Sequence, residues 1–310
     1  MPLDGLLVID KPVGPTSHDV VSRVRRILRE RRIGHTGTLD PLASGMLLLV
    51  VGRATRLAQF MSADTKRYDA TIRLGFSTDT YDALGRPSAA HVGTLPARDR
   101  IEDALSRFRG TFAQQPPAFS AKKIEGRRSY RLARAAVRVE AGPPTLPAPV
   151  AVTVSKLDIL DIADDLVRVD LVCSSGFYVR SLAHDLGVAL GVGGHLAALR
   201  RTESSGRTLE EAVPLSALEA QATGSDLARQ ALIPLPDVLP DLPQVTLTPE
   251  GVRRAVTGCD VGERDVASES RSESPGTFPG RVRLLDRAQN LVGIADLRPS
   301  GLLHPVVILM

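Results

Sequence analysis

The sequence predicts an α+β protein in which a mixed, mainly antiparallel sheet flanked by helices precedes a small β-rich domain. Within residues 1–233, apolar runs typical of strands are interspersed with segments of helical periodicity. Residues 234–243 (PLPDVLPDLP) hold four prolines, which predicts a stiff linker. Residues 244–310 are short and rich in strand-like runs. A length of 310 residues also favours two domains over one.

Composition and charge exclude several classes of protein. The hydrophobic fraction of 43% is sufficient for a core, and the net charge of +4 is compatible with a polyanionic partner. Cys173 and Cys259 lie too far apart in sequence to suggest a disulfide framework or a metal site, which suits a cytoplasmic protein. We expect no signal peptide and no membrane span, because no apolar run approaches the roughly 20 residues that a span requires.

The first elements lead to a conspicuous loop. Residues 5–11 (GLLVIDK) predict a strand, and a helix is expected to begin at residues 15–17 with Ser17 as its N-cap. One helical face is apolar, and the other is basic, carrying Arg23, Arg25, Arg26 and Arg29. These arginines form either an ordinary solvated face or a surface that contacts phosphates. The loop follows at residues 34–45, and the apolar run 46–51 predicts a buried strand directly after it.

The later elements follow from periodicity and from turn residues. Helices are expected near 54–61, 100–109, 127–137 and up to Leu190, and strands over 66–76, 150–160, 166–174, 282–285, 291–295 and 306–309. The strands 150–160 and 166–174 flank a short polar turn and should pair antiparallel. Gly191, Gly193 and Gly194 follow the helix that ends at Leu190, so they predict its C-terminus and not a dinucleotide-binding loop.

The loop at residues 34–45 (GHTGTLDPLASG) is the main candidate for chemistry. Its three glycines and one proline predict a tight irregular turn anchored on the strand that follows. Asp40 is the only acid in the loop, and it lies between Leu39 and Pro41. A partly desolvated carboxylate is costly unless a cation pairs with it, so we expect a basic partner elsewhere in the chain.

Other catalytic arrangements lack their sequence signals. The six histidines are scattered, so the clustered ligands of a metal hydrolase are missing. No G-x-S-x-G and no G-x-x-x-x-G-K-[ST] motif occurs, which argues against a serine hydrolase elbow and a P-loop. Covalent catalysis by a carboxylate fits the remaining inventory of a lone acid and abundant arginine.

The loop closely resembles the signature of the TruB family of bacterial tRNA pseudouridine synthases. Supporting stretches occur in the family's order, namely LLVIDKP (6–12), KRY (66–68), QPP…SAK (115–122), GFYVRSL (176–182) and LRRT (199–202). The resemblance covers about residues 5–215. It implies the pseudouridine synthase fold for residues 1–233, and the tail (244–310) more weakly resembles a PUA-type RNA-binding module.

The resemblance implies a function. It predicts isomerisation of uridine 55 in the TΨC loop of tRNA to pseudouridine, with no metal and no other cofactor. The expected partner is the tRNA T stem-loop, and neither a protein partner nor an oligomer is implied, so a cytoplasmic monomer is expected. The target base must leave its stack, which costs a few kcal/mol.

The resemblance also implies roles for individual residues. Asp40 matches the catalytic aspartate, which attacks C1′ of the ribose or C6 of the base, or abstracts a 2′ proton. Arg180 matches the arginine that pairs with this carboxylate, the alternative being a plain surface residue. Tyr68 matches the tyrosine that stacks on the flipped base, contributing about 1–3 kcal/mol, and its hydroxyl is a candidate for proton transfer; the alternative is core packing.

Other matched positions surround the expected base pocket. His35 is expected to contact the flipped nucleotide or the space it leaves, or else to be structural, and Tyr178 and Leu199 to line the pocket. Lys11 is expected to be structural or to face a phosphate. Two departures weaken the match: Phe119 replaces a tyrosine of many relatives, and the acidic segment 263–274 is long for a PUA-type module.

Residues 114–149 resemble an insertion that closes over the RNA, the alternative being an ordinary basic surface. The bases expected to contact the RNA backbone are Lys122, Lys123, Arg127, Arg128, Arg131 and Arg134. Two other functions compete with the main one: a guide-dependent synthase acting on another RNA, and a non-catalytic RNA-folding factor that clamps the tRNA elbow.

Overall fold

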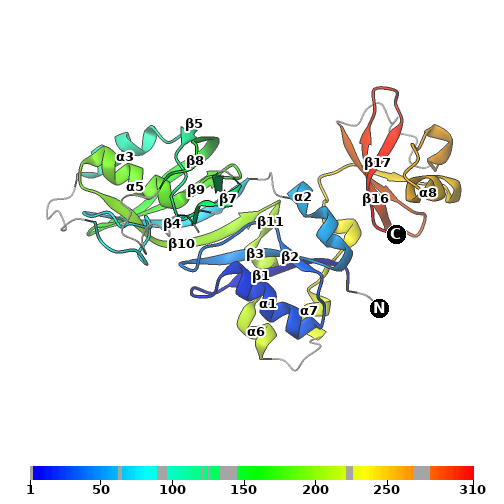
Figure 1. The fold of residues 1–310 in the computed structure, drawn as a ribbon, viewed down its shortest axis with the longest axis horizontal. Coiled ribbons are helices and arrows are strands. Elements are labelled where there is room, and N and C mark those ends of the chain that lie inside the picture. The colour runs from blue at the N-terminus through cyan, green and yellow to red at the C-terminus, as the bar shows by residue number, and fades with distance from the viewer. Residues whose placement is uncertain are drawn as a thin grey trace.

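The two larger sheets of the chain differ in size and are joined by a proline-rich segment (Figure 1). The structure is a computed structural model that describes residues 3–61, 65–88, 96–120, 122–124, 126–130, 132, 145–220, 226–267 and 280–310. The larger sheet and most of the helices lie at one end of the molecule, and the last three strands with α8 lie at the other.

The main sheet has eleven strands, and its central order is β12-β1-β3-β10-β4-β9-β8-β5. Three short strands complete it, with β2 pairing β3, β11 pairing β10 and β13 pairing β1. The strands are β1 (Gly5–Lys11), β2 (Ile33–His35), β3 (Ala43–Val51), β4 (Lys66–Leu74), β5 (Gly110–Gln114), β8 (Val150–Ala163), β9 (Leu166–Cys173), β10 (Gly194–Ser204), β11 (Arg207–Thr208), β12 (Val213–Pro214) and β13 (Ile233–Pro234). Among the paired strands of this sheet that the structure describes, β1–β12 and β3–β10 are parallel and the other pairs antiparallel, so the predicted mixed, mainly antiparallel sheet is confirmed.

Five helices pack on one face of this sheet and form its main core. They are α1 (Ser17–Leu28), α3 (Arg98–Ser106), α5 (Val179–Leu190), α6 (Leu215–Glu219) and α7 (Asp226–Gln230). Figure 1 shows α1, α6 and α7 beside β1–β3, and α3 and α5 beside β8 and β9. Alternate residues of the strands supply the apolar side chains that these helices cover.

The start of α1 differs from the prediction in one respect. Thr16, and not Ser17, is the N-cap, because the Thr16 hydroxyl accepts from the backbone of Asp19 while the Asp19 carboxylate accepts from the backbone of Thr16. The hydroxyl of Ser17 is thereby left for another partner. The helix ends at Leu28, and its C-cap Arg29 adopts the left-handed backbone conformation.

The opposite face of the sheet is divided into an apolar and a charged half. Over β1 and β3, one apolar cluster runs through η1 (Gly52–Leu57), α2 (Ala58–Met61) and the proline segment to the smaller sheet. The helix predicted near 54–61 is therefore mostly a 3₁₀ helix, with a single α-turn at its end. Arg53 and Arg56 donate to the backbone oxygens of Leu309 and Ile308 and so connect η1 to the C-terminal strand.

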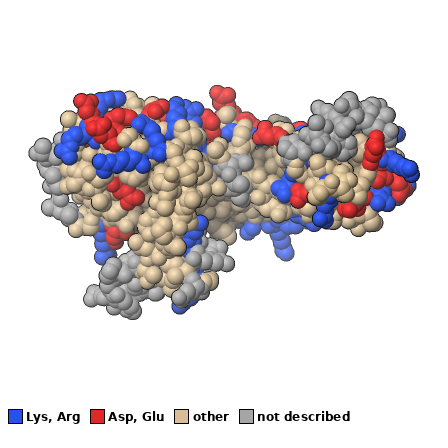
Figure 2. All heavy atoms as spheres, turned by 90° about the horizontal axis from the view of Figure 1, so that it is seen from above, with Lys and Arg blue, Asp and Glu red and all other residues tan. Residues whose placement is uncertain are grey.

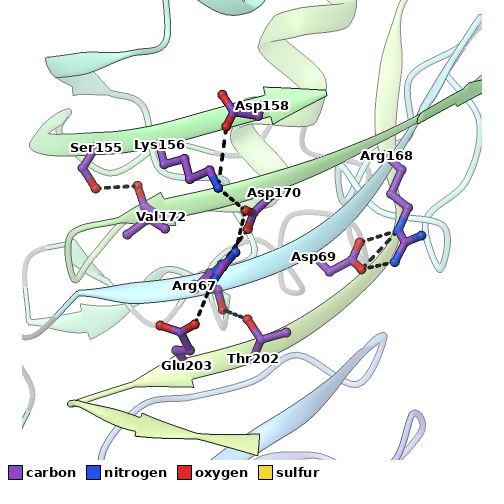
Figure 3. Close-up of polar contacts among 10 residues, drawn as sticks. All are labelled: Arg67, Asp69, Ser155, Lys156, Asp158, Arg168, Asp170, Val172, Thr202 and Glu203. Carbon is purple, nitrogen blue, oxygen red and sulfur yellow. Dashed lines mark hydrogen bonds and ion pairs between the residues drawn. The ribbon is translucent and has the colours of Figure 1, made fainter. Parts of the chain in front are cut away.

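Over β4, β8, β9 and β10, the same face carries ion pairs (Figure 3). Arg67 binds both oxygens of Asp170 at 2.8 Å and also pairs with Glu203 on β10. Lys156 on β8 reaches the same Asp170 at 2.8 Å. The pKa of Asp170 is lowered to about 2, mainly by its hydrogen bonds with Arg67. This charged half therefore links four neighbouring strands by side chains as well as by backbone.

The smaller sheet has the order β14-β15-β16-β17, from β14 (Gln244–Thr246), β15 (Arg281–Leu285), β16 (Leu291–Leu297) and β17 (Leu303–Ile308). The three strands expected in the tail are therefore confirmed, and α8 (Pro249–Val256) packs against them. The boundary at 234–243 stays a prediction, and the segment itself is packed. Arg283 donates to the backbone oxygens of Pro236, Pro240 and Leu242, which orders the proline segment.

The basic insertion contains a short hairpin within the part that the structure describes. Lys123–Ile124 (β6) and Arg127–Arg128 (β7) pair as a hairpin whose turn contains Gly126 at φ +80°, so a helix that starts at Arg127 is wrong. Residues 131 and 133–144, which hold most of the predicted helix, lie outside the described residues. The acidic segment 263–274 lies largely outside them as well.

Candidate active site

The loop at residues 34–45 is held by backbone and side-chain hydrogen bonds from α1 and the turn before it. The Ser17 hydroxyl accepts from the backbone N–H of Leu39 at 2.8 Å and donates to the backbone oxygen of Leu39 at 3.0 Å. The N–H of Gly14 donates to the oxygen of Pro41, and the N–H of Ala43 donates to the oxygen of Asp40. Asp40 is thus anchored on both sides, as expected for a loop that must present one side chain in a fixed direction.

Asp40 pairs with Arg180, as the sequence predicts. The Nε atom of Arg180 lies 2.8 Å from Oδ2 of Asp40. The side chain of Arg180 is 7% exposed, whereas that of Asp40 is 39% exposed. The pair therefore has a buried cation and an accessible carboxylate, which is the arrangement expected for a carboxylate that must meet a substrate. The alternative of a plain surface role for Arg180 is wrong.

Arg180 also joins two further segments of the chain, around residues 80–82 and at Phe119. Its Nη1 donates to the backbone oxygen of Thr80 at 3.1 Å, and its Nη2 to that of Phe119 at 2.9 Å. The carboxylate of Asp82 lies 3.8 Å from Nη1 and was not expected from the sequence. Since Phe119 contributes its backbone oxygen here, the missing tyrosine hydroxyl does not affect this contact. Arginine suits the position because its planar fork can serve several acceptors at once.

Tyr68 lies beside this pair and belongs to the core. Its side chain projects from β4 to the helix-covered face and is 7% exposed. Burial raises the pKa of Tyr68, while the charge of Arg201 and its hydrogen bond to the hydroxyl oppose that rise. The Asp40 carboxylate is also close enough to act on this hydroxyl. The ring therefore packs in the core while its polar end faces the charged groups of the site.

Lys11 and Arg201 add two buried cations. The ammonium of Lys11 donates to the backbone oxygens of Pro12 and Pro15, both at 2.9 Å. Burial lowers the pKa of Lys11 to about 8, while the charge of Asp40 raises it and that of Arg201 lowers it further. Arg201 is 1% exposed and had no assigned role in the sequence, where it appeared only within the LRRT stretch. Its position in a strand next to another arginine gave no signal of burial.

The remaining predicted residues lie around this centre. Tyr178 precedes α5, and its backbone is fixed by two hydrogen bonds with the side-chain amide of Gln114. Its phenol is half-buried, and burial raises its pKa. Arg180 and Asp40 are the charged groups that act on this phenol. Leu199 is half-buried on β10 and aligns with Ala43 of β3. His35 is half-buried at the end of β2, with a buried Nδ1 that has no hydrogen-bond partner, and burial lowers its pKa.

The basic residues expected to contact RNA are only partly described. Lys122 is half-buried and Arg127 is exposed, and Lys123 and Arg128 belong to the hairpin strands. Arg131 and Arg134 lie outside the described residues. On the face drawn in Figure 2, basic and acidic side chains are intermixed, so that face offers no single continuous basic patch.

Comparison with known proteins identifies relatives along the whole chain. The description "TruB family pseudouridylate synthase (N terminal domain)" matches residues 25–179, and "tRNA pseudouridylate synthase B C-terminal domain" matches residues 180–239. The chain is 43% identical over 307 residues to a tRNA pseudouridine synthase B of Solibacter usitatus, covering 99% of this chain and 100% of that protein. It is 36% identical over 305 residues to the protein of the same name from Aquifex aeolicus, covering 98% of each.

A solved structure supports the fold. A chain of a Cbf5-Nop10-Gar1 complex superposes with a TM-score of 0.71 at 26% identity, covering 99% of this chain and 85% of that one. In the part of the chain that the structure describes, no helix is long and apolar enough to cross a membrane.

Proposed function

The chain belongs to the TruB family of pseudouridine synthases, and we propose that it converts uridine 55 of tRNA to pseudouridine with Asp40 as the catalytic carboxylate. In this isomerisation the N1–C1′ bond breaks and a C5–C1′ bond forms, while the hydrogen on C5 leaves and N1 gains one. Bonds and protons balance without any oxidant or reductant.

The observation that carries the proposal is the pair of an accessible carboxylate and a buried guanidinium. Arg180 cannot lose its proton, so it holds Asp40 in place as an anion without competing as an acid. Asp40 is therefore available for attack at C1′ or C6, or for abstraction of a 2′ proton. The half-buried Tyr178 and Leu199 supply apolar surface near Asp40 for an extruded pyrimidine.

Tyr68 is proposed to act at the inner end of the pocket. Its ring offers a face for stacking, and its hydroxyl lies within the electrostatic reach of Asp40. A buried phenol with a raised pKa keeps its proton at neutral pH, so it can donate to or exchange a proton with the base. His35 is proposed to contact the space that the flipped nucleotide leaves, and Lys11 to fix the turn that borders the loop.

Substitution of Asp40 by Asn tests the function directly. The assay measures tritium released from tRNA labelled at C5 of uridine, because only formation of the C5–C1′ bond expels that hydrogen. We expect Asp40→Asn to abolish release while tRNA binding stays within a few-fold of wild type. Asp69→Asn is the matched control, since Asp69 pairs with Arg168 on the charged face and should leave release unchanged.

Three outcomes would count against the proposal. Tritium release by Asp40→Asn at the wild-type rate would remove Asp40 from the chemistry. Loss of binding together with activity would make its role structural. A wild-type protein that binds tRNA without releasing tritium would favour the alternative of a non-catalytic RNA-folding factor.

We propose that the T stem-loop of tRNA is sufficient as the substrate. The protein is then expected to act as a cytoplasmic monomer without a protein partner or a guide RNA. Purified protein should modify a transcribed T stem-loop alone, and light scattering should give the mass of one chain. A requirement for an added protein or RNA would favour the guide-dependent alternative. The segment 244–310 is proposed as a PUA-like RNA-binding domain that begins after the linker at 234–243.

The basic insertion is proposed to grip the RNA backbone. Neutralising Arg128, Arg131 and Arg134 should weaken tRNA binding and reduce the slope of log K against log salt by about one for each phosphate that is no longer neutralised. Arg168→Gln is the control, because that side chain pairs with Asp69 on the charged sheet face. An unchanged slope in the triple variant would exclude the insertion from the RNA interface.

A further inference from the structure

Four strands of the main sheet contribute to one row of aligned residues next to the catalytic loop. In register, Lys11 of β1 aligns with Gly45 of β3, Gly45 with Arg201 of β10, and Arg201 with Tyr68 of β4. Directly aligned residues project to the same face of a sheet. Lys11, Arg201 and Tyr68 therefore emerge side by side on the helix-covered face, and all three are buried.

Gly45 makes this row possible. Its φ is +95°, and a Cβ atom there would lie 2.3 Å from the backbone oxygen of Arg201 and 2.8 Å from its nitrogen. No side chain fits at that distance, so the glycine lets β10 approach β3 closely.

Successive residues of a strand point to opposite faces, so Arg201 lies on the helix-covered face with Tyr68 while its neighbour Arg200 does not. The register shifts between Arg201, which aligns with Tyr68, and Glu203, which aligns with Arg67, so Thr202 is the extra residue. Arg200 points to the other face, where it pairs with Asp10 at 2.7 Å and is 43% exposed. Two adjacent arginines thus have opposite environments.

Arg201 connects the parts of the site that the sequence separates. Its Nε donates to the backbone oxygen of Met46 at 2.7 Å, and its Nη2 donates to that of Gly37, inside the catalytic loop, at 3.0 Å. Its charge also acts on the hydroxyl of Tyr68, the residue directly aligned with it on β4. Among the described residues, no carboxylate forms an ion pair with it. A buried guanidinium is costly, so its retention without a carboxylate indicates a role other than ion pairing.

We infer that Arg201 is a positioning residue that fixes the Tyr68 hydroxyl and the Asp40 loop relative to each other. In this role the guanidinium donates to the oxygen of the aligned phenol, so that the O–H bond of Tyr68 points away from Arg201 and is available to the base. Through Gly37, the same guanidinium holds the loop that carries Asp40. This inference rests on the proposed function, because it assigns Arg201 a role in that reaction.

The test combines Arg201→Met with Tyr68→Phe in a double-mutant cycle. We expect Arg201→Met to lower kcat by at least 100-fold with KM within threefold of wild type. In the Tyr68→Phe background, Arg201→Met should lower log kcat by less than a third of the decrease that it causes in the wild-type background. The reason is that the Tyr68 hydroxyl, which Arg201 positions, is already absent there. Arg200→Met is the matched control and should change kcat by less than threefold.

A spectroscopic readout makes the test independent of turnover. The ring carbon bearing the hydroxyl of Tyr68, labelled with ¹³C, should shift in Arg201→Met but not in Arg200→Met. If Arg201→Met does not fold, Arg201→Lys replaces it in the double-mutant cycle and in the labelling experiment. Lysine keeps the positive charge but has a shorter side chain.

The outcomes separate this inference from the proposed function. A wild-type protein without tritium release refutes the proposed function. With active wild type, three results overturn the inference: full activity of Arg201→Met, losses that multiply in the Tyr68→Phe background, or an unmoved Tyr68 resonance. Full activity of Tyr68→Phe overturns it as well, since the hydroxyl would then have no role.

Discussion

Replacing Arg180 by lysine isolates what the guanidinium contributes beyond its charge. The wild-type side chain serves the Asp40 carboxylate and the backbone oxygens of Thr80 and Phe119 in one plane. A lysine ammonium is a point donor on a shorter reach, so it cannot serve acceptors that lie around a fork. We expect it to keep one of these three hydrogen-bond partners and to leave the other two without a donor.

The magnitude follows from the two missing hydrogen bonds. Hydrogen bonds to charged donors contribute about 1.5–3 kcal/mol each, and the side chain is 7% exposed, so little water replaces them. A loss of about 3–6 kcal/mol in the free energy of unfolding corresponds to a fall in Tm of roughly 5–9 °C for a chain of this size. Displacement of Asp40 by about 1 Å is sufficient to lower kcat by about 100-fold.

Thermal unfolding and tritium release from labelled tRNA measure the two effects on the same preparations. Arg168→Lys is the control, since Arg168 also makes a forked contact with a carboxylate, on Asp69, but its side chain is 55% exposed. Exposed pairs contribute little, so this variant should lose under about 1 kcal/mol and keep its activity. If Arg180→Lys melts within 1 °C of wild type and turns over within threefold, the guanidinium geometry does not hold the site together.

Three further predictions concern other parts of the site and its support. Gly45→Ala should destabilise the protein by at least about 2 kcal/mol in denaturant unfolding. A left-handed backbone alone costs alanine about 1–2 kcal/mol, and the added Cβ would also overlap the backbone of β10. If the variant is as stable as wild type, β10 can move away from β3. Arg67→Met should lower stability by about 2 kcal/mol or less at pH 6, and the difference should shrink steadily as pH falls from 4 to 2, because the lowered pKa of Asp170 stabilises the fold only while that carboxylate is ionised. A difference as large at pH 2 as at pH 6 would contradict this. The pKa of Lys11, followed by NMR of its ε-carbon, should be about 8. It should fall in Asp40→Asn, since the Asp40 carboxylate raises it. An unchanged or higher pKa in this variant would show that the Asp40 charge does not act on Lys11.

Much of the fold was predictable because local pattern and tertiary structure agree. The strands 150–160 and 166–174 carry alternating apolar residues around a polar turn, and they pair as expected. The helix ending at Leu190 stops where Gly191 adopts φ +74°, which its sequence position predicts. The pairing of Asp40 with Arg180 came from family resemblance, since nothing in the spacing of 140 residues indicates that the two side chains meet.

Other features depend on contacts that a sequence pattern does not contain. The helix predicted over 127–137 does not start at Arg127, because Gly126 provides a left-handed turn that lets two short strands pair. Arg200 and Arg201 point to opposite faces of the sheet, and which of the two is buried depends on the register of β10 against β4. The proline segment is predicted to act as a spacer, but Arg283, distant in sequence, fixes its carbonyls.

The apolar cluster on the face of β1 and β3 opposite the helices constrains the loss of the C-terminal strands during evolution. Leu57, Met61, Leu235 and Val238 are covered on their outer side by the last strands of the chain. A homologue that lacked those strands would expose these side chains to water as a hydrophobic patch, which promotes self-association. Shorter homologues should therefore have exchanged several of these four positions for hydrophilic residues, and their retention as large aliphatics in a soluble truncated homologue would show that another cover has evolved.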